Sequence, residues 1–164
     1  MSAVCQMVSE VMRQPVVTIG PGATVEDVTT LVTTHGIHHV PIVQRGKLLG
    51  IVCACDVAGS RPDLRALPFA RRNVVTAQPD SSVADVARLM IKHAVGSVLI
   101  ANGDGLWGIV TRDDVAYLSA ELAALLDETR CASCRSTHHL RQVAGDTLLC
   151  KACADRANAS HWFE

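Results

Sequence analysis

The chain has 164 residues, 49% of them hydrophobic, and a formal net charge of −1. This length is sufficient for one core of ordinary size or two small ones, and the near-neutral charge excludes a field that would draw the whole molecule to nucleic acid or to an anionic membrane. The sequence has neither a run of about 18 apolar residues nor a basic, apolar leader. We therefore expect a cytoplasmic protein with no membrane span.

A duplicated unit makes up most of the chain. Residues 16–58 align with residues 74–116 without a gap, and about 18 of the 43 aligned positions are identical. This agreement is far beyond accident, so the two segments are copies of one structural unit.

Each copy predicts the same elements in the same order: a short strand, a helix, a hairpin of two strands and a second helix. Thr24 and Ser82 are suitable N-caps for the first helices, and an aspartate follows each of them three residues later. The predicted strands lie at 16–18, 38–43 and 48–53 in the first copy and at 74–76, 97–101 and 106–111 in the second.

A unit of this size is marginally stable alone, so we expect an α/β (α+β) fold in which the two copies pack as a pseudo-twofold pair. Residues 60–72 contain two prolines and four arginines and serve as the linker. After the second copy, residues 115–130 contain no Gly or Pro and carry leucines at helical spacing, which predicts one continuous helix.

The C-terminal region contains two Cys-x-x-Cys pairs separated by fifteen residues. This spacing places two thiolate pairs across a hairpin and is typical of a tetrahedral Zn²⁺ site. Four thiolates close the coordination shell, so the expected zinc is structural and supplies most of the folding energy of a small finger. A histidine, His138, His139 or His161, could replace one thiolate, and redox sensing by zinc release is a further alternative. The expected ligands are Cys131, Cys134, Cys150 and Cys153.

The repeat resembles a tandem pair of CBS (cystathionine β-synthase) domains over about residues 8–120. The resemblance rests on the opening VMRQPVVTIGPGATVEDV, on GIHHVPIV at 36–43, on the strand ends GKLLGIVCACDV and GLWGIVTRDDV, and on the repetition itself. It implies a regulatory module without catalysis of its own, usually a homodimer, that binds adenosine ligands such as AMP, ADP or ATP in clefts between the repeats. The C-terminal region resembles a zinc-ribbon or treble-clef finger.

These comparisons divide the chain into four parts. The first CBS repeat is expected at 8–60, the second at 66–120, a connecting helix at 121–130, and the finger with its tail at 131–164.

The strand-to-helix corner of the second repeat suits a nucleotide. The Thr111 hydroxyl can donate to a phosphate, and the Asp114 carboxylate one turn later can accept from both ribose hydroxyls. The same pair is equally suited to capping a helix. In the first repeat Asp56 is retained but Cys53 replaces the hydroxyl, and a thiol is a weak donor, so we expect one competent site and one weaker or empty site.

Other ligand contacts are implied by the resemblance. Val75, Thr76, Ala77, Val95, Gly96 and Ser97 are candidates for the adenine, and Arg112, Ile37 and His38 complete the set.

Three functions are compatible with the sequence. The first is a non-enzymatic nucleotide sensor that signals through the helix and the finger to an unidentified protein partner. The second, which we favour less because acidic residues offset the basic ones, is a nucleic-acid-binding regulator that uses the cations of the finger. The third is a dimerising scaffold with empty clefts. Enzymatic activity is not expected, because no nucleophile, base and orienting group can be assembled from the motifs. The finger cations are Arg135, Arg141, Lys151 and Arg156.

Overall fold

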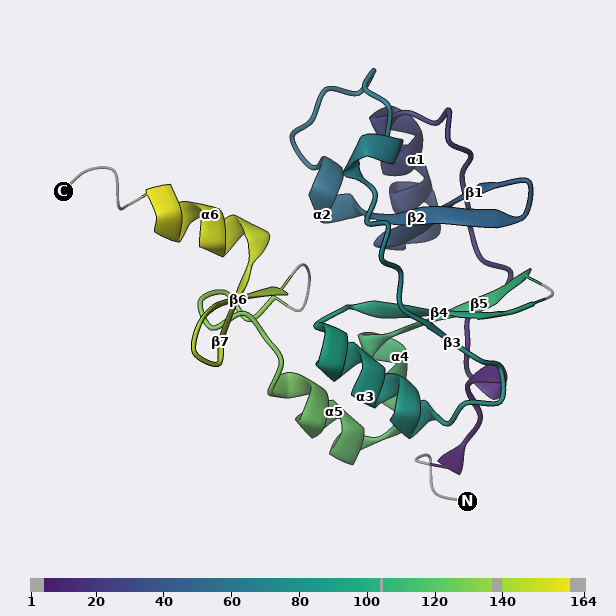
Figure 1. Ribbon diagram of the computed structural model, residues 1–164, viewed down its shortest axis with the longest axis vertical. Coiled ribbons are helices and arrows are strands. Elements are labelled where there is room, and N and C mark those ends of the chain that lie inside the picture. Colours follow the sequence, from purple (N-terminus) through teal and green to yellow (C-terminus); the bar gives the residue numbers. More distant parts are fainter. Residues whose placement is uncertain (1–4, 104, 137–139, 160–164) are drawn as a thin grey trace.

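The computed structural model describes residues 5–103, 105–136 and 140–159. Two sheets face one another across the middle of the molecule, and the helices of each repeat cover the outer face of its own sheet (Figure 1). The first repeat consists of α1 (Val25–His35), β1 (His39–Gln44), β2 (Lys47–Cys53) and α2 (Ala54–Val57). The second consists of β3 (Thr76–Ala77), α3 (Val83–His93), β4 (Ser97–Asn102), β5 (Gly105–Thr111) and α4 (Arg112–Leu118).

The first helix of each repeat begins at the predicted cap. The Thr24 hydroxyl accepts from the backbone N–H of Asp27, while the Asp27 carboxylate accepts from the Thr24 N–H at 2.8 Å. Ser82 caps α3 in a similar way. Both hairpins are antiparallel, as expected. The opening strand predicted at 16–18 is reduced to an isolated parallel bridge between Ile19 and Ile42, so the first sheet has two strands and the second has three.

The two repeats exchange their flanking segments. Arg13, which precedes the duplicated segment 16–58, forms a β-bridge with Ile109 on β5, and Arg71 in the linker forms one with Ile51 on β2. The side chains of the N-terminal segment also belong to the other repeat: Val8 and Met12 are buried in the core of the second repeat. Each half therefore depends on chain from the other half, which ties the pair together.

The helix predicted at 115–130 is wrong as a single element. The backbone is extended at Ser119, with φ −151° and ψ 119°, and this residue ends α4 and caps α5 (Ala120–Asp127). The break has a physical reason: α5 contacts α3 and buries Leu122 and Leu126 in the core of the second repeat. We infer that a continuous helix would carry these leucines away from that core.

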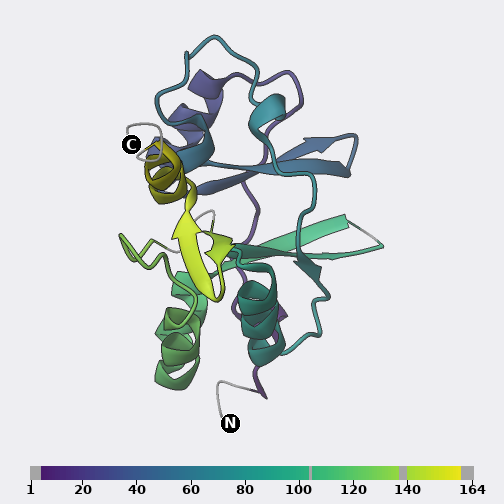
Figure 2. The ribbon, with the colours of Figure 1, turned by 60° about the vertical axis from the view of Figure 1, so that its left-hand side comes forward.

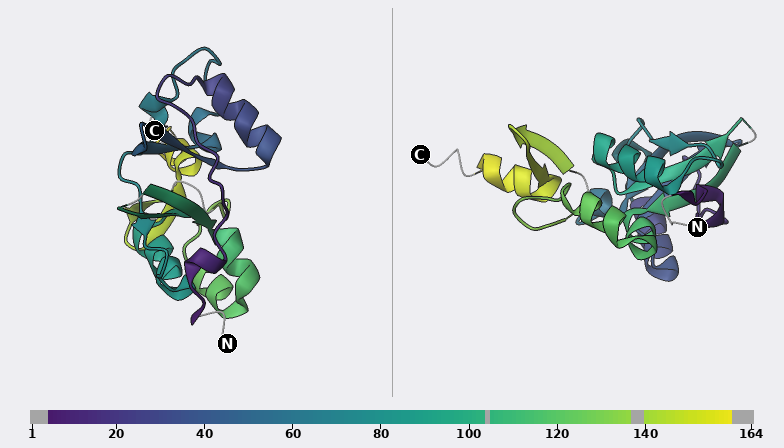
Figure 3. Two further views of the ribbon diagram at one scale, coloured as in Figure 1. Left: turned by 90° about the vertical axis from the view of Figure 1, so that its right-hand side faces the viewer. Right: turned by 90° about the horizontal axis from the view of Figure 1, so that it is seen from below.

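The finger follows α5 and lies beside one end of the two sheets (Figures 1 and 3). It consists of the antiparallel hairpin β6 (Leu140–Ala144) and β7 (Thr147–Cys150) and the helix α6 (Lys151–Ala159). The helix α6 begins directly after Cys150 and contains Cys153, so the second cysteine pair opens the helix. Among the described residues, no helix is both long enough and apolar enough to cross a membrane.

Candidate functional site

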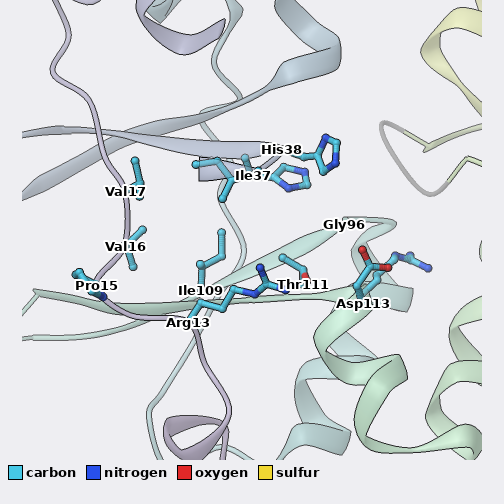
Figure 4. Close-up of a pocket in the computed structure, with 13 residues that line it drawn as sticks. Arg13, Pro15, Val16, Val17, Ile37, His38, Gly96, Ile109, Thr111 and Asp113 are labelled. Atoms are coloured by element: carbon cyan, nitrogen blue, oxygen red, sulfur yellow. The ribbon is translucent and has the colours of Figure 1, made fainter. Parts of the chain in front are cut away.

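A cavity of about 230 Å³ lies between the two repeats and is lined by both (Figure 4). Its apolar walls come from Val16, Val17 and Ile37 on the first-repeat side and from Ile109 on β5. The complete lining is Arg13, Pro15, Val16, Val17, Gly36, Ile37, His38, His39, Gly96, Ile109, Thr111, Arg112 and Asp113.

The structure brings part of the predicted ligand set to this cavity. Five predicted residues line it: Ile37, His38, Gly96, Thr111 and Arg112. The opening segment that lines the cavity with Thr111, however, is Pro15–Val17 of the first repeat, rather than Val75–Ala77 of the second. The repeat offset of 58 relates Val75 to Val17, so the alignment itself points to Val17 as a cavity residue. The alignment does not, however, predict that the two repeats exchange their flanking segments.

Four of the five remaining predicted adenine contacts serve the interior of the second repeat. Val75 and Val95 pack against its core, Ala77 belongs to that core, and Ser97 is buried at the start of β4. Thr76 is exposed on β3.

The Thr111 corner is a capping box with an added arginine. Asp114 Oδ2 accepts from the Thr111 backbone N–H at 2.8 Å and from the Thr111 hydroxyl at 2.7 Å. Asp114 Oδ1 accepts from Arg13 Nε at 2.8 Å and forms an ion pair with its terminal nitrogen at 2.7 Å. Asp114 lines a neighbouring surface pocket rather than the cavity, while Asp113 lines both. The carboxylate thus caps α4 and holds Arg13 at the cavity.

Arg112 is buried, with 5% of its surface exposed, and its guanidinium is anchored to backbone oxygens. Its Nε donates to the Val95 carbonyl at 3.0 Å. One terminal nitrogen donates to the Leu126 carbonyl at 2.9 Å and to the Thr129 hydroxyl at 2.7 Å. Burial lowers the pKa of Arg112 to about 10. Arg112 therefore joins the cavity rim to Leu126 near the end of α5 and to Thr129, two residues before Cys131.

The corner of the first repeat has a different environment. Cys53 is buried, and this burial raises the pKa of its thiol to about 12, so the thiol stays neutral. Burial also raises the pKa of Asp56, although the Cys53 N–H, which donates to it at 3.3 Å, and the charges of Arg71, Lys151 and Arg141 act in the opposite direction. The last two of these cations belong to the finger.

The four C-terminal cysteines converge as predicted. Their sulfur atoms all lie within 4.8 Å of one another, and Cys134 Sγ is 3.6 Å from Cys150 Sγ. A tetrahedron with Zn–S bonds of about 2.3 Å has sulfur–sulfur edges of about 3.8 Å, so this cluster fits zinc. Burial raises the pKa of the Cys131 thiol, but the backbone N–H groups of Cys134 and Cys150 outweigh it and hold the pKa at about 6. His138, His139 and His161, the alternative ligands, lie outside the described residues.

Two of the finger cations considered for nucleic acid have partners within the finger. Lys151 forms an ion pair with Asp155 at 2.6 Å, and Arg156 donates to Cys153 Sγ at 3.0 Å. Arg135 and Arg141 are exposed. The contacts of Lys151 and Arg156 reduce the positive charge that a phosphate backbone would meet.

Comparison with known proteins places the repeats in context. The family model described as the CBS domain matches residues 8–62 and 64–121. An uncharacterised protein of Methanocaldococcus jannaschii is 32% identical over 111 residues, which cover 66% of this chain and 42% of the relative. The chain spans less than half of the length of the first curated relatives that it matches.

Two similar solved structures contain adenosine ligands. The CBS domain pair of one protein, in complex with 5′-methylthioadenosine and S-adenosyl-L-methionine, is 28% identical, has a TM-score of 0.65, and aligns over 70% of this chain and 95% of that chain. The cytosolic domain of the Mg²⁺ channel MgtE, in complex with ATP, is 27% identical, has a TM-score of 0.61, and aligns over 69% of this chain and 48% of that chain.

Proposed function

Because the chain belongs to the CBS domain family, we propose that it is a regulatory module that binds an adenosine nucleotide in the cavity between its repeats. The observation that carries this proposal is the cavity itself, which combines apolar walls from both repeats with the Thr111 hydroxyl and the Arg13 guanidinium at one corner. The adenosine complexes of two similar structures support the ligand class.

The geometry suggests how a nucleotide is held. At about 230 Å³ the cavity is a little smaller than the roughly 300–1,000 Å³ of typical small-molecule sites, so it suits the nucleoside, with the phosphates at its mouth. In the proposed complex Val17, Ile37 and Ile109 contact the adenine. Arg13 turns from Asp114 to a phosphate, which leaves Asp114 Oδ1 for the ribose hydroxyls.

The two corners are proposed to differ. Thr111 offers a hydroxyl and lines the cavity, while at the equivalent position Cys53 offers a buried neutral thiol. We propose that the Thr111 corner is the main nucleotide site and that the Cys53 corner contributes a weaker site or none.

Calorimetric titration with AMP, ADP and ATP tests this proposal. Thr111→Val should weaken binding about 10- to 100-fold and Thr111→Ser should preserve it, because a charge-assisted hydrogen bond contributes about 1.5–3 kcal/mol. Asp114→Ala should weaken binding about 10- to 100-fold, and Asp56→Ala should have a smaller effect. Equal losses in the two aspartate variants would reject the asymmetry, and no binding to the wild-type chain would reject the nucleotide function.

We further propose that the four-cysteine cluster holds a structural Zn²⁺ and that the finger carries the signal to a protein partner. Arg112 supports this connection, since it contacts both the cavity rim and the end of α5 that leads into Cys131. The functional unit is proposed to be a homodimer. Native mass spectrometry tests both points, with one zinc per chain and two chains per particle as the expected result.

A further inference from the structure

The Cys53 and Asp56 corner of the first repeat lies near the finger, whereas, in the described part of the chain, the Thr111 and Asp114 corner of the second repeat does not. The repeat offset of 58 relates Gly36, which lines the cavity, to Ala94 at the end of α3. It also relates the Arg13 and Asp114 pair to Arg71 and Asp56. These equivalent positions outline where a second nucleotide cleft would open.

The finger lies at this place. Ala94 packs against the buried cluster that holds the finger together, so the rim of the second cleft is an apolar contact of the finger. That cluster consists of Cys131, Leu140, Cys150 and Cys153, with Leu148 and Leu149 packed against it. Figures 1 and 2 show the finger at the side of the molecule where β2 ends and β4 begins.

The charges match across this contact. Arg141 on β6 and Lys151 at the start of α6 lie close enough to the Asp56 carboxylate to oppose the effect of its burial on the pKa. Arg71 of the linker acts in the same direction, and Asp155 interacts with both finger cations. The carboxylate that would bind a ribose in the second cleft thus lies in the electrostatic field of three cations of this same chain, two of them on the finger.

We propose that the finger docks on the first-repeat corner, through Ala94 and through Asp56 with Arg141 and Lys151, and thereby closes the second cleft to nucleotide. Docking and a nucleotide in the second cleft are mutually exclusive, and this exclusion rests on the proposed nucleotide function. It gives the asymmetry of the two clefts a cause beyond Cys53, and it makes the finger a movable part whose release exposes a second site.

Hydrogen–deuterium exchange of the zinc-loaded full chain tests the docking without any nucleotide. The variant Arg141→Glu/Lys151→Glu should accelerate exchange at residues 53–57 and 94–97 about fivefold, because two repulsive charges replace two attractive ones. Arg135→Glu, which changes the charge at another exposed arginine of the same finger, should leave both segments unchanged. Unchanged exchange in α3 and one zinc per chain establish that the variants are folded and loaded.

A charge swap tests whether the docking depends on the interaction of Asp56 with Arg141 and Lys151 in particular. Asp56→Lys combined with Arg141→Glu and Lys151→Glu should restore the slow exchange of residues 94–97. Equal exchange at residues 94–97 in the wild type and in Arg141→Glu/Lys151→Glu would overturn the docking.

Titration with AMP tests the exclusion. The wild type should bind one AMP per chain, and Arg141→Glu/Lys151→Glu should bind two. If that variant shows the faster exchange and still binds one AMP, the closure of the cleft is overturned while the docking stands. If no form binds AMP, the nucleotide function and the exclusion both fail, and the exchange data alone decide the docking.

Discussion

At the scale of single residues, Arg112 and Asp114 show how the same side chain can be read as a ligand contact or as a structural tie. Arg112 lines the cavity, yet its guanidinium is committed to carbonyl groups at the ends of α3 and α5. Asp114 both caps α4 and holds Arg13. Residue type and spacing identified both positions, but only the fold shows which groups each of them contacts.

Replacing Arg112 should reveal its structural role. Arg112→Met should lower the free energy of unfolding by about 3 kcal/mol, because it leaves buried carbonyl groups without donors. Urea denaturation measures this loss. Arg88→Met, which removes an exposed arginine on α3 paired with Asp85 at 2.7 Å, should cost less than about 1 kcal/mol. Equal losses of unfolding free energy in the two variants would show that the buried hydrogen bonds of Arg112 stabilise the protein no more than an exposed ion pair does.

At the scale of elements, the exchanged segments explain why both repeats have a glycine before the Ile-Val pair of the last strand, at Gly50 and at Gly108. A Cβ on Gly50 would lie 2.7 Å from the Arg71 carbonyl oxygen, and a Cβ on Gly108 would collide with the Met12 side chain. Each glycine lets the flanking segment of the other repeat approach the sheet. The repeat alignment indicates the importance of these positions, and the crossing chain supplies the reason.

Substitution at Gly50 should disturb this crossing. Gly50→Ala should destabilise the protein by about 1–3 kcal/mol, since its neighbour is backbone that cannot move aside without breaking the bridge to Ile51. Thermal unfolding followed by circular dichroism measures the change. Gly20→Ala is the matched control, because nothing lies within 4 Å of the added methyl group, and its melting temperature should stay near that of the wild type. A Gly50→Ala protein as stable as this control would contradict the proposed close approach.

At the scale of the whole molecule, two kinds of stability are combined. The repeats bury apolar cores, whereas the finger has one small cluster in which Cys131, Cys150 and Cys153 accompany Leu140. Such a cluster is too small to hold a fold without metal. The finger should therefore unfold on its own when zinc is removed.

Metal removal tests this division. A strong chelator should increase hydrogen exchange across residues 131–136 and 140–159 and leave α1 and α3 protected, with native mass spectrometry reporting the loss of one zinc. AMP at about 100 times its dissociation constant should still stabilise the chelated protein by at least about 2.7 kcal/mol, because the cavity lies between the repeats and does not depend on the finger. Collapse of the repeats on chelation would show that the metal supports the whole fold.

The sequence by itself determined the duplicated α/β unit, the caps at Thr24 and Ser82, both hairpins and the convergence of the four cysteines, because each of these follows from local propensity or from fixed spacing. Only the tertiary structure decided that α4 and α5 separate at Ser119, that Val16 and Val17 rather than Val75 and Thr76 line the cavity, and that the finger lies against Ala94. These features depend on which distant segments bury one another, and such contacts are determined by packing across the whole chain rather than by the pattern of any one stretch.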